Sequence, residues 1–282
     1  MIRTRTAPDK TEMFVGAAAR YRSPHMDMDG LNHIEIGRER GVPVIFTHGW
    51  GRSHHDFIPI AESLAPTCRS VLLDLPGFGE TPRPDADWGT QDYAEFLHGW
   101  VRDRLGAKSF IWVGHSFGGR IGLRLASGRA EGLASLILVA SHGIRMPRSA
   151  SATLKASLRQ RRFKALKARA SDADLIELEK RFGSADYVAS RESGLRDIFV
   201  KTVAEDQRPD LTKIACPTTL IYGGQDADTP PAMGRAMAAL IPGADYIECA
   251  PYGHISLLDR GRHQIALSVK EHVARIGQGG AA

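Results

Sequence analysis

The chain has 282 residues, of which 43% are hydrophobic and 24% charged, with 29 glycines and 15 prolines. This composition is typical of a globular protein, and it excludes disordered, collagen-like and membrane-spanning classes. Three scattered cysteines without a C-x-x-C pair predict neither a disulfide framework nor a zinc ribbon. Because no apolar run reaches membrane-spanning length and no leader is evident, we expect a cytoplasmic protein that is not inserted in a membrane.

The formal net charge is +5, but it is unevenly distributed along the chain. Nine Lys or Arg and no acid lie between Ser141 and Ser171, and the first 23 residues carry +3, so the remainder is net negative. Such a stretch is most often a solvated helix face. The alternatives are attraction of an anionic substrate or weak adhesion to a membrane or to nucleic acid. No interleaved aromatic residues favour nucleic acid, so we expect no such partner.

Short β-rich apolar runs recur along the chain, separated by stretches long enough for helices. The Asp29-Gly30 turn predicts an antiparallel opening pair of strands over 25–28 and 31–36. The later runs cover residues 44–47, 70–74, 110–113, 136–140, 218–222 and 245–248. The central runs are almost continuously apolar, as strands buried on both faces are. The alternation predicts an α/β fold with a mostly parallel central sheet flanked by helices.

Nearly eighty residues after Ser141 contain no convincing strand, whereas apolar positions recur there at helical spacing. A bare loop of that length is improbable, so we predict a helical cap over 144–209, inserted after the sixth strand. The core then comprises 24–143 and 210–276. We expect an N-terminal arm over 1–23 and a flexible Gly/Ala-rich tail over 277–282.

A G-x-S-x-G motif follows the strand that ends at Val113, with Ser116 at its centre and a helical segment after it. In this motif the serine occupies a sharp, strained turn that exposes its hydroxyl, and the flanking glycines avoid clashes with neighbouring backbone. The pattern is weak evidence by itself, because Gly and Ser are abundant in the chain.

Three other polar segments also follow predicted strands. They are the turn His48-Gly49-Trp50-Gly51, the segment Gly223-Gly224-Gln225-Asp226 and the segment Ala250-Pro251-Tyr252-Gly253-His254. Open α/β sheets place their sites at the carboxyl ends of parallel strands, so these segments are expected to meet at one edge of the sheet.

Together these motifs strongly resemble the α/β-hydrolase family over about residues 25 to 275, including Asp74-Leu75-Pro76-Gly77-Phe78-Gly79. The order Ser116, Asp226, His254 matches that family's Ser, acid, His order. The resemblance is closest to the capped esterase, lactonase and carbon–carbon hydrolase branch. Haloalkane dehalogenases and epoxide hydrolases are similar too, but they use an Asp nucleophile where this chain has Ser116.

The resemblance implies a catalytic role for each member of the triad. His254 accepts the proton of Ser116 during attack and returns it to the leaving group, while Asp226 orients the imidazole and stabilises its positive form. The backbone N–H groups of Trp50 and Phe117 are expected to form the oxyanion hole. Asp226 competes with Asp228 as the acid, and the spacing to Gly223 and Pro230 favours Asp226.

The expected substrate pocket includes His48, Phe78, His142 and Ile144, although His48 is more readily explained as a hydrogen-bonding residue of the oxyanion loop. His54, His55, His98 and His115 are interpreted as surface or packing residues, and Asp74 as structural or close to the site. Gly114 to Gly119 has the spacing of a phosphate-binding loop, but Arg120-Ile121 replaces the required Lys and Ser/Thr. No H-E-x-x-H or C-x-x-C motif occurs, so we expect no metal and no cofactor.

The sequence therefore predicts a capped serine hydrolase that cleaves a small-molecule carboxylic ester or lactone through an acyl-enzyme. Two alternatives stay open: a carbon–carbon bond hydrolase acting on a dienone-type acid, and a ligand receptor that retains the fold with little turnover. The sequence does not predict the oligomeric state.

Overall fold

The computed structural model describes residues 2–4, 26–106, 108–147 and 149–279. The chain divides into two compact units. One is formed by Met1–Ile144 and Asp206–Ala282, and the other, which we call the helical unit, is Arg145–Glu205. In the described residues, no helix combines the length and the apolar character needed to cross a membrane.

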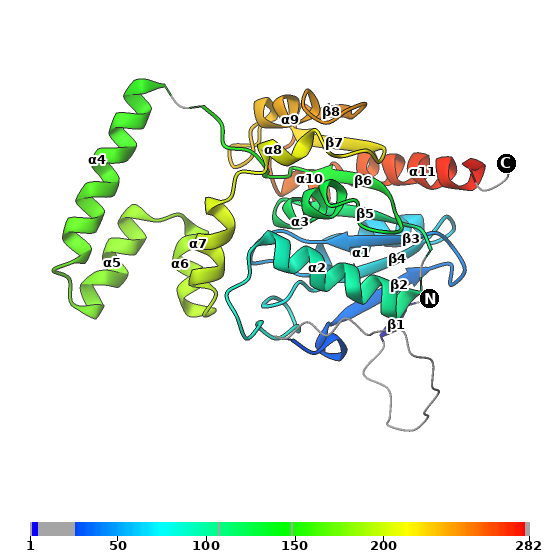
Figure 1. Ribbon diagram of the computed structural model, residues 1–282, viewed down its shortest axis with the longest axis horizontal. Helices are drawn as coiled ribbons and strands as arrows, with labels where there is room; N and C mark the ends of the chain where they lie inside the picture. Colours follow the sequence, from blue (N-terminus) through cyan, green and yellow to red (C-terminus); the bar gives the residue numbers. More distant parts are fainter. Residues whose placement is uncertain (1, 5–25, 107, 148, 280–282) are drawn as a thin grey trace. The chain divides into compact units, whose positions relative to one another are not determined.

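The first unit is built on an eight-stranded sheet with the order β1-β2-β4-β3-β5-β6-β7-β8 (Figure 1). β2 pairs antiparallel with β1 and β4, and all later neighbours pair in parallel. The strands are β1 (Ile2–Thr4), β2 (His33–Gly37), β3 (Pro43–Thr47), β4 (Arg69–Leu73), β5 (Phe110–His115), β6 (Leu133–Val139), β7 (Thr218–Gly223) and β8 (Asp245–Cys249). The prediction of a mostly parallel sheet is confirmed.

Side chains that alternate along the strands form the core under one face of the sheet. Val44 and Phe46 of β3, with Ile111 and Val113 of β5, pack there with buried residues of helices α1 and α11. β5 is buried at every position, which accounts for its continuous apolar sequence. The strand that carries the predicted nucleophile therefore lies at the centre of the sheet.

Helices cover the sheet, and several pack in pairs (Figure 1). α1 packs against α11, α2 packs against α3, and α9 contacts β7 and β8. The helices of this unit are η1 (Met28–Gly30), η2 (His54–Phe57), α1 (Ile58–Leu64), α2 (Thr90–Trp100), the π-helical turn η3 (Val101–Leu105), α3 (Phe117–Ser127), α8 (Arg208–Leu211), α9 (Pro231–Ala238), α10 (Ser256–Asp259) and α11 (Arg262–Gly279).

The predicted opening hairpin is wrong. Met28–Gly30 forms a short 3-10 helix whose start is capped by the Asp27 carboxylate, which accepts from Asp29 N at 3.0 Å. The Asp-Gly pair thus ends a helical turn rather than joining two strands. β2 instead finds its antiparallel partners in β4 and in β1, which lies within the segment predicted as an arm. Residues 5–23 of that arm lie outside the described residues.

Two predicted boundaries also differ from the structure. α11 continues to Gly279, three residues into the predicted tail, because helical hydrogen bonding tolerates glycine in a last turn; 280–282 lie outside the described residues. The first unit resumes at Asp206 rather than at 210. Gln207 N donates to Gly143 O at 2.9 Å and Gln207 Nε2 to Arg120 O at 2.8 Å, which ties this segment to the sheet unit.

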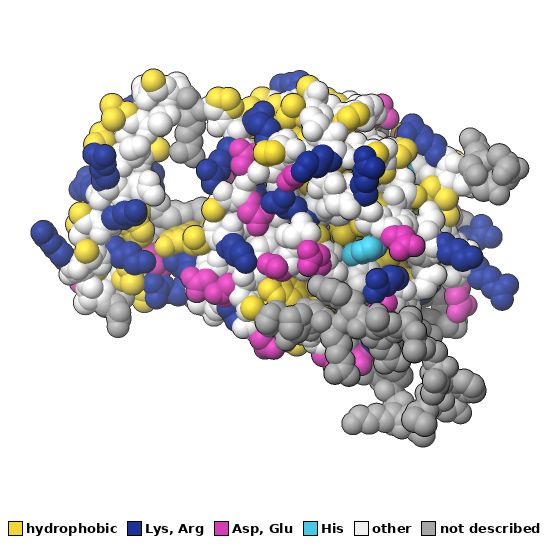
Figure 2. Space-filling model, in the orientation of Figure 1, with side chains coloured by type: hydrophobic (Ala, Val, Ile, Leu, Met, Phe, Trp, Pro, Cys, Tyr) yellow, Lys and Arg dark blue, Asp and Glu magenta, His cyan; other side chains and the backbone are white. Residues whose placement is uncertain are grey.

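The helical unit contains α4 (Ala150–Lys167), α5 (Asp172–Phe182), α6 (Ala185–Glu192) and α7 (Arg196–Ala204). α4 carries most of the basic stretch, and Lys and Arg side chains are visible along it among hydrophobic ones (Figure 2). Arg159, Arg161 and Arg162 are all exposed. Phe163 is half-buried against Phe182 of α5, with ring centroids 5.6 Å apart. The exposure of these arginines agrees with the expectation that the basic stretch is solvated.

One acid joins three helices of this unit. Glu179 of α5 is 1% exposed and accepts two hydrogen bonds of 2.8 Å from Arg191 of α6. Arg196 of α7 donates to the same carboxylate at 2.8 and 3.0 Å, and its guanidinium lies 3.7 Å from the Tyr187 ring centroid. The hydrogen bonds from Arg191, followed by those from Arg196, lower the pKa of Glu179 to about 2 against burial. The carboxylate is therefore ionised at neutral pH.

We expect Glu179→Gln to lower the free energy of unfolding of the full chain by roughly 3 kcal/mol at pH 7, because it leaves two guanidinium groups without their anion. A pKa of about 2 in the folded state, below the ordinary 4.5, means that this stabilisation is complete above about pH 4.5 and is lost towards pH 2. Urea unfolding at several pH values should therefore show the difference from wild type narrowing in acid.

The matched control is Glu177→Gln on the same helix, where the Glu177 side chain is 75% exposed and forms an ion pair with a surface lysine, Lys180. This substitution should leave the unfolding midpoint unchanged. Equal midpoints of wild type and Glu179→Gln at pH 7, or a difference that persists undiminished at pH 3, would contradict the assignment.

Candidate active site

Ser116 lies between β5 and α3 in a backbone conformation that L-residues rarely adopt, with φ 49° and ψ −104°. Glycines make the turn possible. A Cβ at Gly114 would lie 2.5 Å from Gly119 N, and one at Gly118 would lie 2.6 Å from Thr47 Oγ1. The turn is fixed by Ser116 N, which donates to Val139 O of β6 at 3.0 Å. The G-x-S-x-G sequence thus folds as the strained strand-to-helix turn that the motif predicts.

Asp226 and His254 form a hydrogen-bonded pair after β7 and β8. His254 Nδ1 donates to Asp226 Oδ2 at 2.8 Å, and the aspartate is 4% exposed. Thr229 supports the same carboxylate through its N–H and its hydroxyl, both at 2.8 Å. Burial raises the pKa of Asp226, but the hydrogen bonds from His254 and Thr229 outweigh burial and hold it below its ordinary value. The carboxylate is therefore ionised beside the imidazole.

His254 is hydrogen-bonded to Asp226 rather than to its rival Asp228. Asp228 is exposed, and its backbone N–H donates to Asp226 Oδ1 at 2.9 Å. Ligand atoms of Asp226, Asp228 and His254 all lie within 4.8 Å of one another, so this cluster also has residue types that bind metals. However, both Asp226 oxygens already accept hydrogen bonds from within the chain, which suits an acid–imidazole pair.

Ser116 and His254 reach the same edge of the sheet, because β5, β7 and β8 run parallel and both residues follow carboxyl ends. The ring of His115 lies 4.7 Å from the ring of His254, centroid to centroid. Within the described residues, no hydrogen bond joins Ser116 Oγ to the His254 ring. Catalytic hydrogen bonds of this kind often close only when substrate is bound.

The loop after β3 passes directly against the Ser116 turn. A Cβ at Gly49 would lie 2.8 Å from His115 Nδ1 and 3.3 Å from Ser116 Cβ, so a side chain there would force these neighbours to shift. The Trp50 ring packs edge-on against Phe78 and Phe117, with centroid distances of 4.9 and 5.4 Å. Phe117 is the first residue of α3, where backbone N–H groups have no partner within the helix. These contacts keep the Trp50 and Phe117 backbones close to Ser116.

Two residues of the expected pocket, His48 and Ile144, are fully buried, and for His48 this agrees with its interpretation as a hydrogen-bonding residue of the loop after β3. His48 is fully buried, with Nδ1 donating to Gly49 O at 2.7 Å and Nε2 accepting from Leu75 N at 2.9 Å. Burial lowers the pKa of His48 to about 4, so the ring is neutral. Both ring nitrogens are hydrogen-bonded within the chain and stabilise the loop after β3. Ile144 is also fully buried, and it belongs to the sheet unit rather than to the helical unit.

His142 is half-buried, and its Nδ1 accepts from Arg120 Nη1 at 2.9 Å. Burial, and then the Arg120 charge, lower the pKa of His142 to about 4. The ring is therefore neutral with its proton on Nε2. Phe78 is 7% exposed and lies in the aromatic cluster around Trp50, so it contributes packing to this loop.

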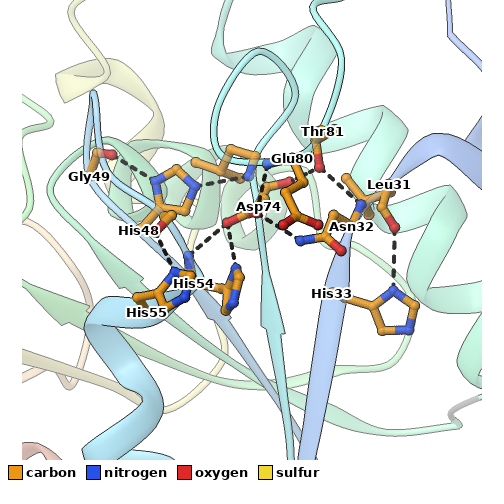
Figure 3. Close-up of polar contacts among 12 residues, drawn as sticks. Leu31, Asn32, His33, His48, Gly49, His54, His55, Asp74, Glu80 and Thr81 are labelled. Atoms are coloured by element: carbon orange, nitrogen blue, oxygen red, sulfur yellow. Dashed lines mark hydrogen bonds and ion pairs between the residues drawn. The ribbon is translucent and has the colours of Figure 1, made fainter. Parts of the chain in front are cut away.

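The buried carboxylate of Asp74 joins the segments that contain Asn32, His54 and Glu80 (Figure 3). Its Oδ1 accepts from His54 N at 2.7 Å and from His54 Nδ1 at 2.9 Å. Its Oδ2 accepts from Asn32 Nδ2 at 2.8 Å and Glu80 N at 3.0 Å. Burial raises the pKa of Asp74, but these donors outweigh burial and lower it. The structural interpretation of Asp74 and the packing role of His54 agree with this network.

Thr229 and His115 both contact the Asp226–His254 pair, and neither contact was predicted from the sequence. The Thr229 hydroxyl bridges Asp226 and Ala140 O, and it lies 3.2 Å from His254 Nδ1. The sequence signal that could have indicated Thr229 is its place directly before Pro230-Pro231. A turn that follows the acid supplies hydrogen-bond donors to the carboxylate of that acid. His115, interpreted as packing, hydrogen-bonds to the His254 backbone. Its adjacency to Ser116 does not reveal that contact.

Residues 42–261 match the alpha/beta hydrolase fold family. A pimeloyl-[acyl-carrier protein] methyl ester esterase of Chromobacterium violaceum is 29% identical over 255 residues, covering 83% of this chain and 95% of its own. A dihydrolipoyllysine-residue acetyltransferase component of the acetoin cleaving system of Pseudomonas putida is 23% identical over 257 residues, covering 86% of this chain but only 64% of its own length.

Solved structures agree in fold. An enol-lactonase from Burkholderia xenovorans LB400 superposes with a TM-score of 0.67 at 23% identity, covering 89% of this chain and all of its own. An esterase from Exiguobacterium antarcticum superposes with a TM-score of 0.65 at 20% identity, covering 86% and 95%. The family match spans most of the chain and the strained serine turn lies at its centre, so this protein belongs to the alpha/beta hydrolase fold family.

Proposed function

We propose that this hydrolase cleaves a carboxylic ester or lactone through an acyl-enzyme, with Ser116, His254 and Asp226 as its triad. One observation carries the proposal. The 2.8 Å hydrogen bond from His254 Nδ1 to the buried Asp226 fixes the imidazole tautomer that leaves Nε2 as a base. Ser116 occupies the strained turn at the same sheet edge, where its side chain is half-buried rather than packed away.

Acylation begins when His254 Nε2 takes the Ser116 hydroxyl proton and Oγ bonds to the substrate carbonyl carbon. The tetrahedral intermediate then breaks its bond to the leaving oxygen, which receives the proton from the imidazolium. An ester releases its alcohol at this step, whereas a lactone opens and keeps its new hydroxyl on the acyl group. The ionised Asp226 stabilises the imidazolium throughout.

Deacylation repeats the same steps with water. His254 removes a proton from a water molecule whose oxygen attacks the acyl carbon, and Ser116 Oγ leaves with that proton. The products are a carboxylic acid and the free serine. Acid, base and nucleophile are all side chains of this chain, so the proposed reaction requires neither a metal nor another cofactor.

The carbonyl oxygen becomes negative in both tetrahedral intermediates and needs preorganised donors. We assign this role to the backbone N–H groups of Phe117 and Trp50, which the packing of Gly49 and of the Trp50 ring holds beside Ser116. The Phe117 N–H also belongs to the first turn of α3, whose dipole favours negative charge. One such donor contributes about 3 kcal/mol to transition-state stabilisation.

The ester or lactone class is supported by the names of the similar proteins, which include a methyl ester esterase and an enol-lactonase. The helical unit is inserted between β6 and β7, and we propose that it is the cap that selects the substrate. Cleavage of a carbon–carbon bond and ligand binding without turnover are the competing outcomes of the first test below.

In that test, wild type and Ser116→Ala are assayed with p-nitrophenyl acetate, butyrate and octanoate, a lactone and a dienone-type acid. We expect wild type to hydrolyse at least one ester or the lactone, and Ser116→Ala to lose at least about 10⁴-fold in kcat, because the nucleophile is missing. Turnover of none, or equal rates for the two proteins, would overturn the proposal. Turnover of the dienone acid alone would favour the carbon–carbon reaction.

A second pair of variants tests the acid. We expect Asp226→Asn to lower kcat by about 10³- to 10⁴-fold, because an amide no longer stabilises the imidazolium or fixes its tautomer. Asp228→Asn is the matched control, since Asp228 is exposed and its hydrogen bond to Asp226 comes from its backbone N–H, which the substitution keeps. If both variants lose activity equally, or if Asp226→Asn retains it, the assignment of Asp226 fails.

A further inference from the structure

His115 is the last residue of β5 and is fully buried among three loops of the candidate site. Its ring lies 4.7 Å from the ring of His254, with 47° between the planes. On another side it faces the loop after β3, because a Cβ at Gly49 would lie 2.8 Å from its Nδ1. It therefore contacts the base and the predicted oxyanion loop, and it directly precedes Ser116.

The two nitrogens of this ring are used unequally. Nε2 lies 3.3 Å from the backbone oxygen of His254, and a carbonyl only accepts, so Nε2 carries the proton. Among the described residues, Nδ1 has no hydrogen-bond partner although it is buried. An unpartnered buried acceptor lowers the stability of the fold, so packing by itself does not explain why a histidine occupies this position.

The surroundings also keep this ring neutral. Burial, followed by the nearby His254, lowers the pKa of His115 well below its ordinary value. Arg52, from the loop after β3, acts in the same direction, while Asp226, from the loop after β7, acts weakly against it. His115 is thus a donor that carries no charge beside a base that must become cationic during the reaction. A lysine or arginine there would donate too, but its charge would oppose the imidazolium.

We propose that His115 is a positioning residue that anchors the His254 backbone and thereby aims the imidazole at Ser116. The inference rests on the proposed function. Asp226 holds the His254 ring at Nδ1, whereas His115 holds the main chain of the same residue, in a segment between β8 and α10 that lacks regular structure. Two attachments fix both the place and the rotation of the ring. A displacement of about 1 Å in such a geometry can cost 10²-fold in rate.

The test measures kcat, KM and thermal midpoint for His115→Phe and His115→Gln, using the p-nitrophenyl ester that wild type hydrolyses best. Phenylalanine keeps a ring but lacks the donor, and it removes the unpartnered acceptor. We expect kcat to fall about tenfold with KM within twofold of wild type, while the thermal midpoint stays the same or rises. Glutamine can return an N–H to the His254 carbonyl, so His115→Gln should recover kcat to within about threefold of wild type.

His115→Asn provides a second comparison that does not depend on the phenylalanine variant folding. Its amide is polar like that of glutamine but one methylene too short to reach the His254 carbonyl. We therefore expect it to be as impaired in kcat as His115→Phe. A merely structural polar requirement would instead make the asparagine and glutamine variants alike.

His272 supplies the control for loss of a buried neutral histidine. It is 1% exposed, bonds Ser135 and Thr219, and its pKa is lowered to about 4 by burial. His272→Phe should lower the thermal midpoint and leave kcat per folded molecule unchanged, the reverse of the His115→Phe result.

The inference is overturned if His115→Phe keeps kcat within twofold of wild type, if the glutamine variant is as slow as the phenylalanine or asparagine variant, or if kcat falls only in step with folding. Ser116→Ala separates this failure from failure of the proposed function. If Ser116→Ala abolishes turnover and the His115 variants do not change it, only the positioning role is lost. If Ser116→Ala stays active, the hydrolase mechanism itself is wrong.

Discussion

The steric constraint at Ser116 determines much of the surrounding structure. A positive φ at a serine is unfavourable, and it persists only where neighbouring atoms leave no other path. Here Val139 of β6 holds the Ser116 N–H, while Thr47 of β3 fills the space where Gly118 would carry a side chain. Both strands are direct neighbours of β5. The strand order therefore maintains the turn, and the continuous burial of β5 supplies the stability that offsets its strain.

Around this turn the buried aspartates are ionised, whereas buried histidines are neutral. Asp74 and Asp226 each receive several hydrogen bonds, so both stay ionised despite burial. Near His48 and His115 the surrounding carboxylates do not offset burial, so both rings stay neutral. The neutral imidazoles of His48 and His115 hydrogen-bond to the loops beside Ser116, while the ionised Asp226 accepts from His254. Under the proposed function, His254, which pairs with Asp226, is the imidazole available for proton transfer.

Much of this structure could be predicted from the sequence, because local pattern and chain order decide it. Apolar runs identified the parallel strands, and motifs at their carboxyl ends identified Ser116, Asp226 and His254 as neighbours at one sheet edge. Partners that depend on long-range packing could not be predicted. β2 pairs with β4 instead of forming a hairpin at Asp29-Gly30, so tertiary contacts override a plausible local alternative. The hydrogen-bonding role expected of His48 agrees with the structure, but its second partner, Leu75 N, lies in another loop and could not be predicted.

The basic stretch illustrates why net charge says little about this protein's partners. Arg159 donates to the carbonyl oxygens of Arg181 and Phe182, at the C-terminal end of α5, where a cation stabilises the helix dipole. This arginine therefore has a role within its own unit. Arg161 and Arg162 are exposed on α4, which also exposes Leu154 and Leu158. Cations spread around a helix among exposed leucines do not form the one-sided pattern expected of a helix that lies in a membrane surface. The cations of α4, which contribute much of the positive charge of the chain, are thus either exposed to solvent or, as with Arg159, bound to the end of α5.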